Sequence, residues 1–148
     1  FRIDTTAPTV TSVSSSTSNG AYKEDDNVTI TVTLSETVIV DNSSGNLRIL
    51  LETGTNDRYA NYVSGSSSSV LSFIYTVQSG DSASDLDYIS TSSLLVNSGI
   101  IRDYASNNAT LTLPSLGTSG SLGSSKALFE FGGSRRTVRL DGLDFTRD

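Results

Sequence analysis

Apolar and polar residues alternate with a period of two along most of this chain of 148 residues. In the clearest run, residues 28–34, threonines separate four apolar positions, which are Val28, Ile30, Val32 and Leu34. Because successive side chains of a β-strand point to opposite faces, this pattern predicts a half-buried strand with a polar outer face. No long stretch shows the helical period of about 3.6 residues, and the sequence therefore predicts an all-β fold.

Further strand-like runs follow at short intervals, separated by turn residues such as Gly, Asn, Asp and Ser. They are residues 9–16, 47–51, 59–63, 71–77, 111–113, 127–131 and 137–140. This rhythm is typical of an immunoglobulin-like β-sandwich with Greek-key connections and about seven strands or more. The length fits one such domain, residues 1–148.

The alternation also predicts which side chains form the core. We expect these to be Val28, Ile30, Val32, Leu34, Leu47, Ile49, Phe73, Tyr75, Val77, Ile101, Leu111 and Leu113. Residues 113–125 are rich in Gly and Ser and predict a long loop, while a short helical turn is expected near residues 83–86 or 92–96. The break at Gly132-Gly133-Ser134 predicts a hairpin between the last two strand-like runs.

The chain contains no His and no Cys, which excludes a His general base, a Cys nucleophile, disulfides and ordinary zinc sites. Three routes to chemistry remain: a carboxylate pair, a dyad of Ser125 and Lys126, and an internal isopeptide bond formed by Lys23 beside Glu24. None of them stands in a recognisable motif. We therefore expect a protein that is not an enzyme.

Charge and hydropathy argue against two classes of partner. The net charge is −6 and Arg135-Arg136 is the one close basic pair, so nucleic-acid binding is not expected. The apolar runs are too short for membrane insertion. With 28 Ser, 18 Thr, few Lys and no Cys, the composition favours an exported bacterial protein, extracellular or at the cell surface, that folds without disulfides.

A series of short motifs covers residues 3–128. They are DTTAPTVTSV (4–13), VTITVTLSE (28–36), LETG (51–54), YVSG (62–65), FIYTVQSGD (73–81), SDLDY (84–88), GIIRD (99–103), NNATLTLP (107–114) and GSLG (120–123). In this order they resemble the immunoglobulin-like tandem repeat of very large bacterial cell-surface proteins, including cyanobacterial motility-associated ones. The resemblance implies a structural or adhesive module of a surface fibre or adhesin stalk.

The resemblance also implies a division of the chain into a core repeat, residues 9–128, and two junctions, residues 1–8 and 129–148. Three features depart from the family's pattern. No Gly precedes the Asp in the loop Glu24-Asp25-Asp26-Asn27, and the usual Ala-Gly-Asn loop reads Ala105-Ser106-Asn107. The tail, residues 129–148, is longer than the usual junction, and the family therefore does not predict its structure.

Three loops carry the oxygen ligands that calcium prefers. The candidates are Asp81, Asp85 and Asp87 in one loop, Asp25 and Asp26 in a second, and Asp103 and Asn107 in a third. The alternative is that these side chains close turns by accepting hydrogen bonds from nearby backbone N–H groups. The resemblance adds Asp4, because related stalk domains rigidify their junctions with calcium.

Glycan binding is the alternative function, and it requires exposed aromatic side chains. Tyr22, Tyr88 and Tyr104 are expected near loops. Two exposed, coplanar rings among these three would favour a glycan- or surface-binding module of a secreted protein. The other tyrosines lie in strand-like runs, where we expect them in the core or in cross-strand pairs.

The two ends of the chain resemble each other, since Phe1-Arg2-Ile3-Asp4 aligns with Val138-Arg139-Leu140-Asp141. A tandem array contains repetition of this kind, although four positions can also match by coincidence. The expected partners are therefore neighbouring copies or adjacent repeats of the same protein, head to tail. Residues 1–7 could pair with a neighbour by strand donation, or the terminal strands could add to the chain's own sheets.

Overall fold

The structure is a computed structural model that describes residues 3–131, 136–140 and 143–147. Strands dominate it, and the fold class is all-β, as predicted. The main strands are β1 (Val10–Ser15), β2 (Gly20–Lys23), β3 (Asn27–Asp41), β4 (Arg48–Leu51), β5 (Arg58–Ser64) and β6 (Ser68–Thr76). The remaining elements are β7 (Ser82–Ala83), β8 (Leu94–Leu95), β9 (Ile100–Arg102), α1 (Leu122–Ser125), β10 (Leu128–Phe131), β11 (Arg136–Leu140) and β12 (Leu143–Arg147).

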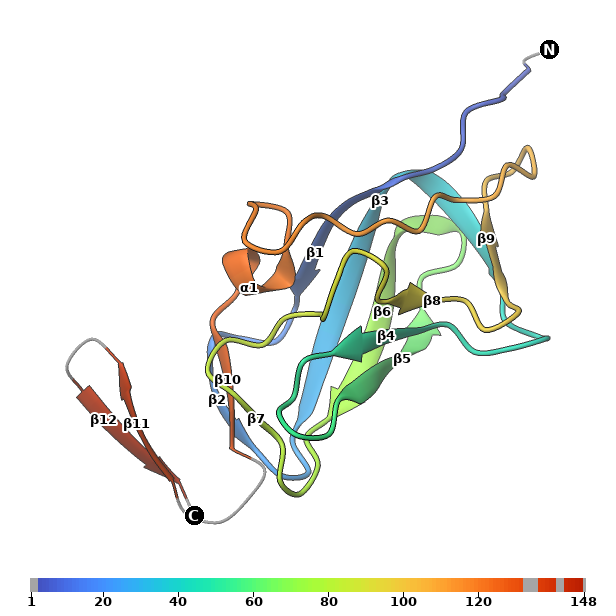
Figure 1. Cartoon of the computed structure of the whole chain (residues 1–148). Coiled ribbons are helices and arrows are strands. Elements are labelled where there is room, and N and C mark those ends of the chain that lie inside the picture. Colours follow the sequence, from blue (N-terminus) through green and yellow to red (C-terminus); the bar gives the residue numbers. More distant parts are fainter. Residues whose placement is uncertain (1–2, 132–135, 141–142, 148) are drawn as a thin grey trace.

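A curled antiparallel sheet forms the main layer of the molecule (Figure 1). Its strands lie in the order β1-β3-β6-β5-β4-β8, and the last part of β3 pairs with β9. The long strand β3 pairs with β6 up to Thr33, and the pairing resumes at Val38 after a register shift. The irregular stretch between them holds Glu36, which is half-buried.

A smaller sheet and a long irregular segment cover the other side of the core (Figure 1). In the smaller sheet β10 lies between β2 and β7, parallel to β2 and antiparallel to β7. The covering segments bury Tyr88, Leu113, Leu122 and Leu128 against the main sheet. The result is a β-sandwich, while the immunoglobulin Greek-key order remains a prediction.

The predicted core is confirmed almost in full, because the alternation places one side of each main strand inward. Eleven of the twelve expected residues are buried, and Leu111 is half-buried against the others. The prediction of a strand at residues 111–113 is wrong. Asn108 and Thr110 form isolated bridges, with Arg102 and Thr9, and residues 111–113 then continue irregularly, with the Leu113 N–H bonded to the carbonyl of Thr91.

The predicted helical turns are also misplaced. Residues 83–86 and 92–96 contribute to the short strands β7 and β8, whereas the helix α1 lies inside the predicted loop 113–125. The side chain of Ser121 caps α1 by accepting a hydrogen bond from the Ser124 N–H, and Leu122 anchors it in the core. Within the described residues, no helix has the length and hydropathy needed to cross a membrane.

The predicted C-terminal hairpin forms with other partners. β10 pairs with β2 and β7, and β11 pairs with β12, so the two runs that flank Gly132-Gly133-Ser134 are not paired with each other. That glycine-rich break lies outside the described residues, as do Phe1, Arg2 and Asp141 of the two similar termini. Residues 3–7 form no strand, and β1 begins at Val10.

Candidate metal centre

Asp103 is a buried carboxylate that organises the turn after β9. Its Oδ1 accepts hydrogen bonds from the backbone N–H groups of Ala105 and Asn107, each at 2.9 Å. Its Oδ2 accepts a third from the side-chain amide of Asn107, also at 2.9 Å. The turn places Ser106 at φ +68°, in the left-handed region that favours glycine. Ser106 thus occupies the position at which the resemblance leads us to expect Gly.

The N-terminal segment is tied to this turn. The side-chain amide of Asn107 also donates to the carbonyl of Asp4 at 2.9 Å, and the Thr110 N–H donates to the carbonyl of Pro8 at 2.8 Å. The Asp4 carboxylate accepts the Thr6 N–H at 2.9 Å and so closes its own short turn. These bonds bring Asp4, from the start of the chain, beside a turn that lies about a hundred residues later.

Glu36 completes a group of three carboxylates. One oxygen from each of Asp4, Glu36 and Asp103 lies within 4.8 Å of the others. The three residues come from the N-terminal segment, the irregular part of β3 and the turn after β9. Asp4 and Glu36 line an open cavity of about 780 Å³ together with Thr6, Thr37, Tyr104 and Ala105.

This donor set suits a hard cation such as calcium, which binds carboxylate and other oxygen ligands. Oδ1 of Asp103 already accepts two hydrogen bonds, whereas Oδ2 accepts one from the Asn107 amide, so Oδ2 is the oxygen that can also bind a cation. Burial alone would raise the pKa of Asp103. The hydrogen bonds from the side chain and backbone of Asn107 and the backbone of Ala105 outweigh it, and the pKa lies below its usual value of 3.8. The carboxylate form is therefore favoured in the folded protein.

The other predicted metal ligands lie elsewhere. Among the described residues, the group around Asp103 is the one place where three acidic side chains converge in this way. Asp103 and Asn107 share one turn, as their spacing led us to expect, and the structure places Asp4 beside them, which the sequence did not predict. Asp25, Asp26, Asp81, Asp85 and Asp87 are not part of such a group. Glu36 was not among the predicted ligands, because in the sequence it is a single acidic residue within a run rich in Thr and Val.

Asp81 stabilises the fold through protein partners. It is buried, and its oxygens accept hydrogen bonds from the Arg58 Nε at 2.9 Å, the Tyr75 hydroxyl at 2.6 Å and the Gln78 N–H at 2.8 Å. Arg58 thereby also forms an ion pair with it. A buried carboxylate with a paired charge and satisfied oxygens is a structural link rather than an open ligand.

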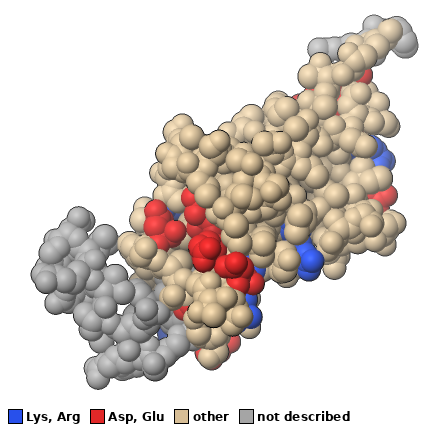
Figure 2. Space-filling view, in the orientation of Figure 1, with Lys and Arg blue, Asp and Glu red and all other residues tan. Residues whose placement is uncertain are grey.

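The loop of Asp25 and Asp26 closes a turn, the alternative that the sequence left open, while Asp87 accepts the N–H of the next residue, Tyr88, at 2.9 Å. The carboxylate of Asp26 accepts the Lys23 N–H at 2.9 Å, and Asp25 takes a left-handed φ of +76°. Burial raises the pKa of both Asp85 and Asp87. Figure 2 shows acidic side chains gathered on the surface near α1, β7 and β10.

The tyrosines predicted near loops do not form an aromatic platform. Tyr104 is 71% exposed, but Tyr88 is 1% exposed and Tyr22 packs partly buried against the core. Tyr88 instead donates its hydroxyl to the carbonyl of Pro114 and so holds the covering segment. Two of these rings would have to be exposed and coplanar, and that condition is not met.

The structure does not supply the geometry that an isopeptide bond at Lys23 or a dyad of Ser125 and Lys126 would need. The side chain of Lys23 is 55% exposed and lies 3.8 Å from the Asp26 carboxylate, whereas an isopeptide bond would need a buried lysine. The Ser125 hydroxyl donates to the carbonyls of Val13 and Ser121. Ser125 therefore serves the end of α1, and the expectation that the chain is not an enzyme stays a prediction.

The chain matches no protein-family model, no curated protein and no solved structure. The likeness to a bacterial surface repeat therefore rests on the sequence motifs alone.

Proposed function

We propose that the chain is a non-catalytic structural module of an exported bacterial surface fibre or adhesin, which associates end to end with neighbouring copies or repeats. The observation that supports this proposal is the path of the chain through the sandwich. The N-terminal segment enters beside the β9 end of the body, and β10 lies at the opposite end, next to β2 (Figure 1). Such a body extends a fibre when copies are joined in series.

The first strand, β1, and the strand β10 near the other end of the body each pair with a neighbouring strand over several residues. β1 pairs with β3 from Val10 to Ser15, and β10 pairs with β2 over four residues. Both run along the long direction of the body (Figure 1). A force applied along this direction therefore acts on many backbone hydrogen bonds at once, instead of opening them one after another.

Single-molecule stretching tests the mechanical role. The first measurement pulls the chain through its two ends, and the control pulls through cysteines introduced at Asn56 and Gln78, which flank adjacent ends of β5 and β6. The chain has no Cys of its own, so the attachment is specific. We expect a clearly higher unfolding force through the ends. An equal or lower force would contradict a module adapted to tension.

Association between copies is tested separately. Residues 3–7 belong to no sheet, and apart from the hydrogen bonds at the Asp4 carbonyl and the Thr6 N–H they have no backbone partner among the described residues that a neighbour's strand would have to displace. Deletion of residues 1–7 should lower the apparent mass of concentrated protein in sedimentation if strand donation joins the copies. A full-length chain that stays a strict monomer at high concentration would leave only covalent tandem linkage.

A further inference from the structure

Arg48 lies on the outer face of the main sheet, and no charged partner for it is found among the described residues. Arg48, at the start of β4, is opposite Asn61 on β5, which in turn is opposite Ile74 on β6. The inward neighbours Ile49, Ala60 and Phe73 belong to the core, so these three side chains belong to the outer face. They stand on three adjacent strands and are therefore positioned by the rigid part of the fold.

The guanidinium of Arg48 stacks on an aromatic ring. Its carbon Cζ lies 3.8 Å from the centroid of the Tyr59 ring. The Nε atom is buried there and has no hydrogen-bond partner among the described residues. Nor does Arg48 belong to either ion pair of the described residues, which join Lys23 to Asp26 and Arg58 to Asp81. A cation without a counter-charge is unfavourable in such a setting, and an anion beside the accessible part of the guanidinium would supply that charge.

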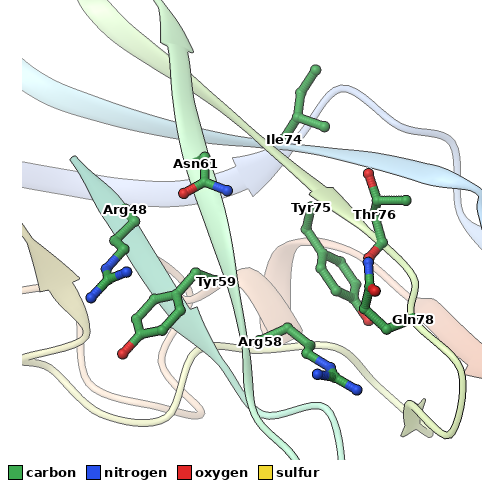
Figure 3. Close-up of a pocket in the computed structure, with 8 residues that line it drawn as sticks. All are labelled: Arg48, Arg58, Tyr59, Asn61, Ile74, Tyr75, Thr76 and Gln78. Carbon is green, nitrogen blue, oxygen red and sulfur yellow. The ribbon is translucent and has the colours of Figure 1, made fainter. Parts of the chain in front are cut away.

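The surface beside Arg48 is hollowed. Figure 3 shows the side chains around a cavity of about 350 Å³, in which Arg48 and Tyr59 stand on one side and Gln78 and Thr76 on the other. Asn61 and Gln78 are exposed, and their amides can donate and accept hydrogen bonds. Arg58 lines the same cavity, but its charge is already paired with Asp81. Arg48 is thus the unpaired cation of a polar hollow.

We propose that this hollow binds an acidic sugar, a uronic acid residue of a polysaccharide, with its carboxylate on the guanidinium of Arg48. A planar guanidinium engages a carboxylate through two parallel hydrogen bonds. The amides of Asn61 and Gln78 and the hydroxyl of Tyr59 bind the hydroxyl groups of the sugar ring. A small anion without hydroxyl groups would leave these three side chains unused. This site goes beyond the structural role proposed above and would make the module adhesive.

The test is titration calorimetry of the full chain with a galacturonate oligosaccharide, its fully methyl-esterified form and sulfated dextran. All titrations contain EDTA, because calcium could bridge an acidic sugar to the acidic protein. We expect binding of the galacturonate that weakens with salt, and no binding of the ester. Absence of galacturonate binding, equal binding of the ester, or stronger binding of the sulfated polymer would each overturn the proposal.

The variants place the site on the molecule. Arg48→Gln should weaken galacturonate binding by roughly tenfold or more, because it removes the charge and the paired donors. Arg48→Lys keeps the charge, and its affinity for galacturonate should lie between those of the original chain and Arg48→Gln. The matched control Arg102→Gln changes an arginine on β9, outside this cavity, and should bind as the original chain does. Equal losses in Arg48→Gln and Arg102→Gln would show attraction to charge in general and would overturn the site.

Discussion

Asp103 and Asn107 are joined by three hydrogen bonds that close the turn after β9. The backbone N–H and the side-chain amide of Asn107 donate to the two carboxylate oxygens of Asp103, each at 2.9 Å, and the Asp103 N–H donates to the Asn107 carbonyl at 3.0 Å. The same amide reaches the Asp4 carbonyl. One side chain therefore links the turn to the segment through which the chain enters the sandwich.

The first prediction concerns this link. Asn107→Ala removes both side-chain hydrogen bonds and leaves a buried carboxylate oxygen with one donor fewer, which should cost about 1–3 kcal/mol of unfolding free energy. Asn108→Ala is the matched control, because Asn108 is exposed and contributes a backbone bridge that alanine retains. Chemical denaturation of both variants measures the difference. Equal stability losses would show that the amide of Asn107 is not a stabilising link.

The second prediction concerns acid. The pKa of Asp103 is lower in the folded state than its usual 3.8, so the folded state binds fewer protons than the unfolded state. The stability that this group provides is present above pH 3.8 and is lost as the pH falls through the folded pKa. Asp85 and Asp87 have raised pKa values and act in the opposite direction, because their folded forms bind protons more readily.

A variant separates these two contributions. Asp103→Asn removes one titrating group and leaves Asp85 and Asp87 unchanged, so the stability difference between the original chain and the variant should shrink as the pH falls below 3.8. Urea unfolding at a series of pH values measures that difference. A difference that stays constant across this window would contradict the lowered pKa.

The third prediction concerns calcium. If the three carboxylates around Asp103 bind calcium in the range typical of extracellular modules, about 1 mM calcium should raise the melting temperature relative to EDTA. Glu36→Gln should reduce this shift, because it removes one of the three carboxylates. Glu24→Gln, in an exposed loop outside the group, should retain it. No shift in the original chain would exclude the site, and loss of the shift only in Glu24→Gln would move it to the loop before β3.

The fourth prediction tests the two faces of β3. Val32 is fully buried, and Val32→Asp places a charge without a partner in the core, at a cost of about 3 kcal/mol or more. Replacement of Thr29, Thr31 and Thr33 by Lys changes the opposite face and should leave the fold intact. Thermal unfolding compares the two variants. Similar melting temperatures for both would mean that the faces have been assigned the wrong way round.

The fifth prediction concerns backbone strain. Ser106 holds a φ of +68°, which costs a residue with a side chain about 1–2 kcal/mol relative to glycine. Ser106→Gly should therefore stabilise the protein, by somewhat less than this amount because glycine also has more freedom in the unfolded chain. The control Ser119→Gly alters an exposed serine that has no positive φ and should not stabilise. A lower melting temperature for Ser106→Gly would contradict the strain.

The alternation of apolar and polar residues predicted those strands whose pairing partners alternate in the same way. Residues 28–34 and 71–77 alternate so regularly that β3, β6 and most of the core follow from the burial of one face. The run 111–113 alternates too, but three residues cannot show whether a neighbouring strand is present, and here none pairs with it. The helix α1 escaped prediction because its four residues depend on the Ser121 cap and the burial of Leu122.

The sequence by itself determined that the chain forms strands and which side of each main strand is apolar, because a period of two is a property of neighbouring residues. It also marked Asp103 and Asn107 as turn-forming residues, since their partners lie within the same loop. Only the tertiary structure decided that Asp4 and Glu36 join them, and that Arg48 lies over Tyr59 with no counter-charge from the described part of the chain. These groupings depend on the register of β3, β4 and β5 and on the course of the N-terminal segment, and residues far apart in sequence meet only when those long-range contacts have formed.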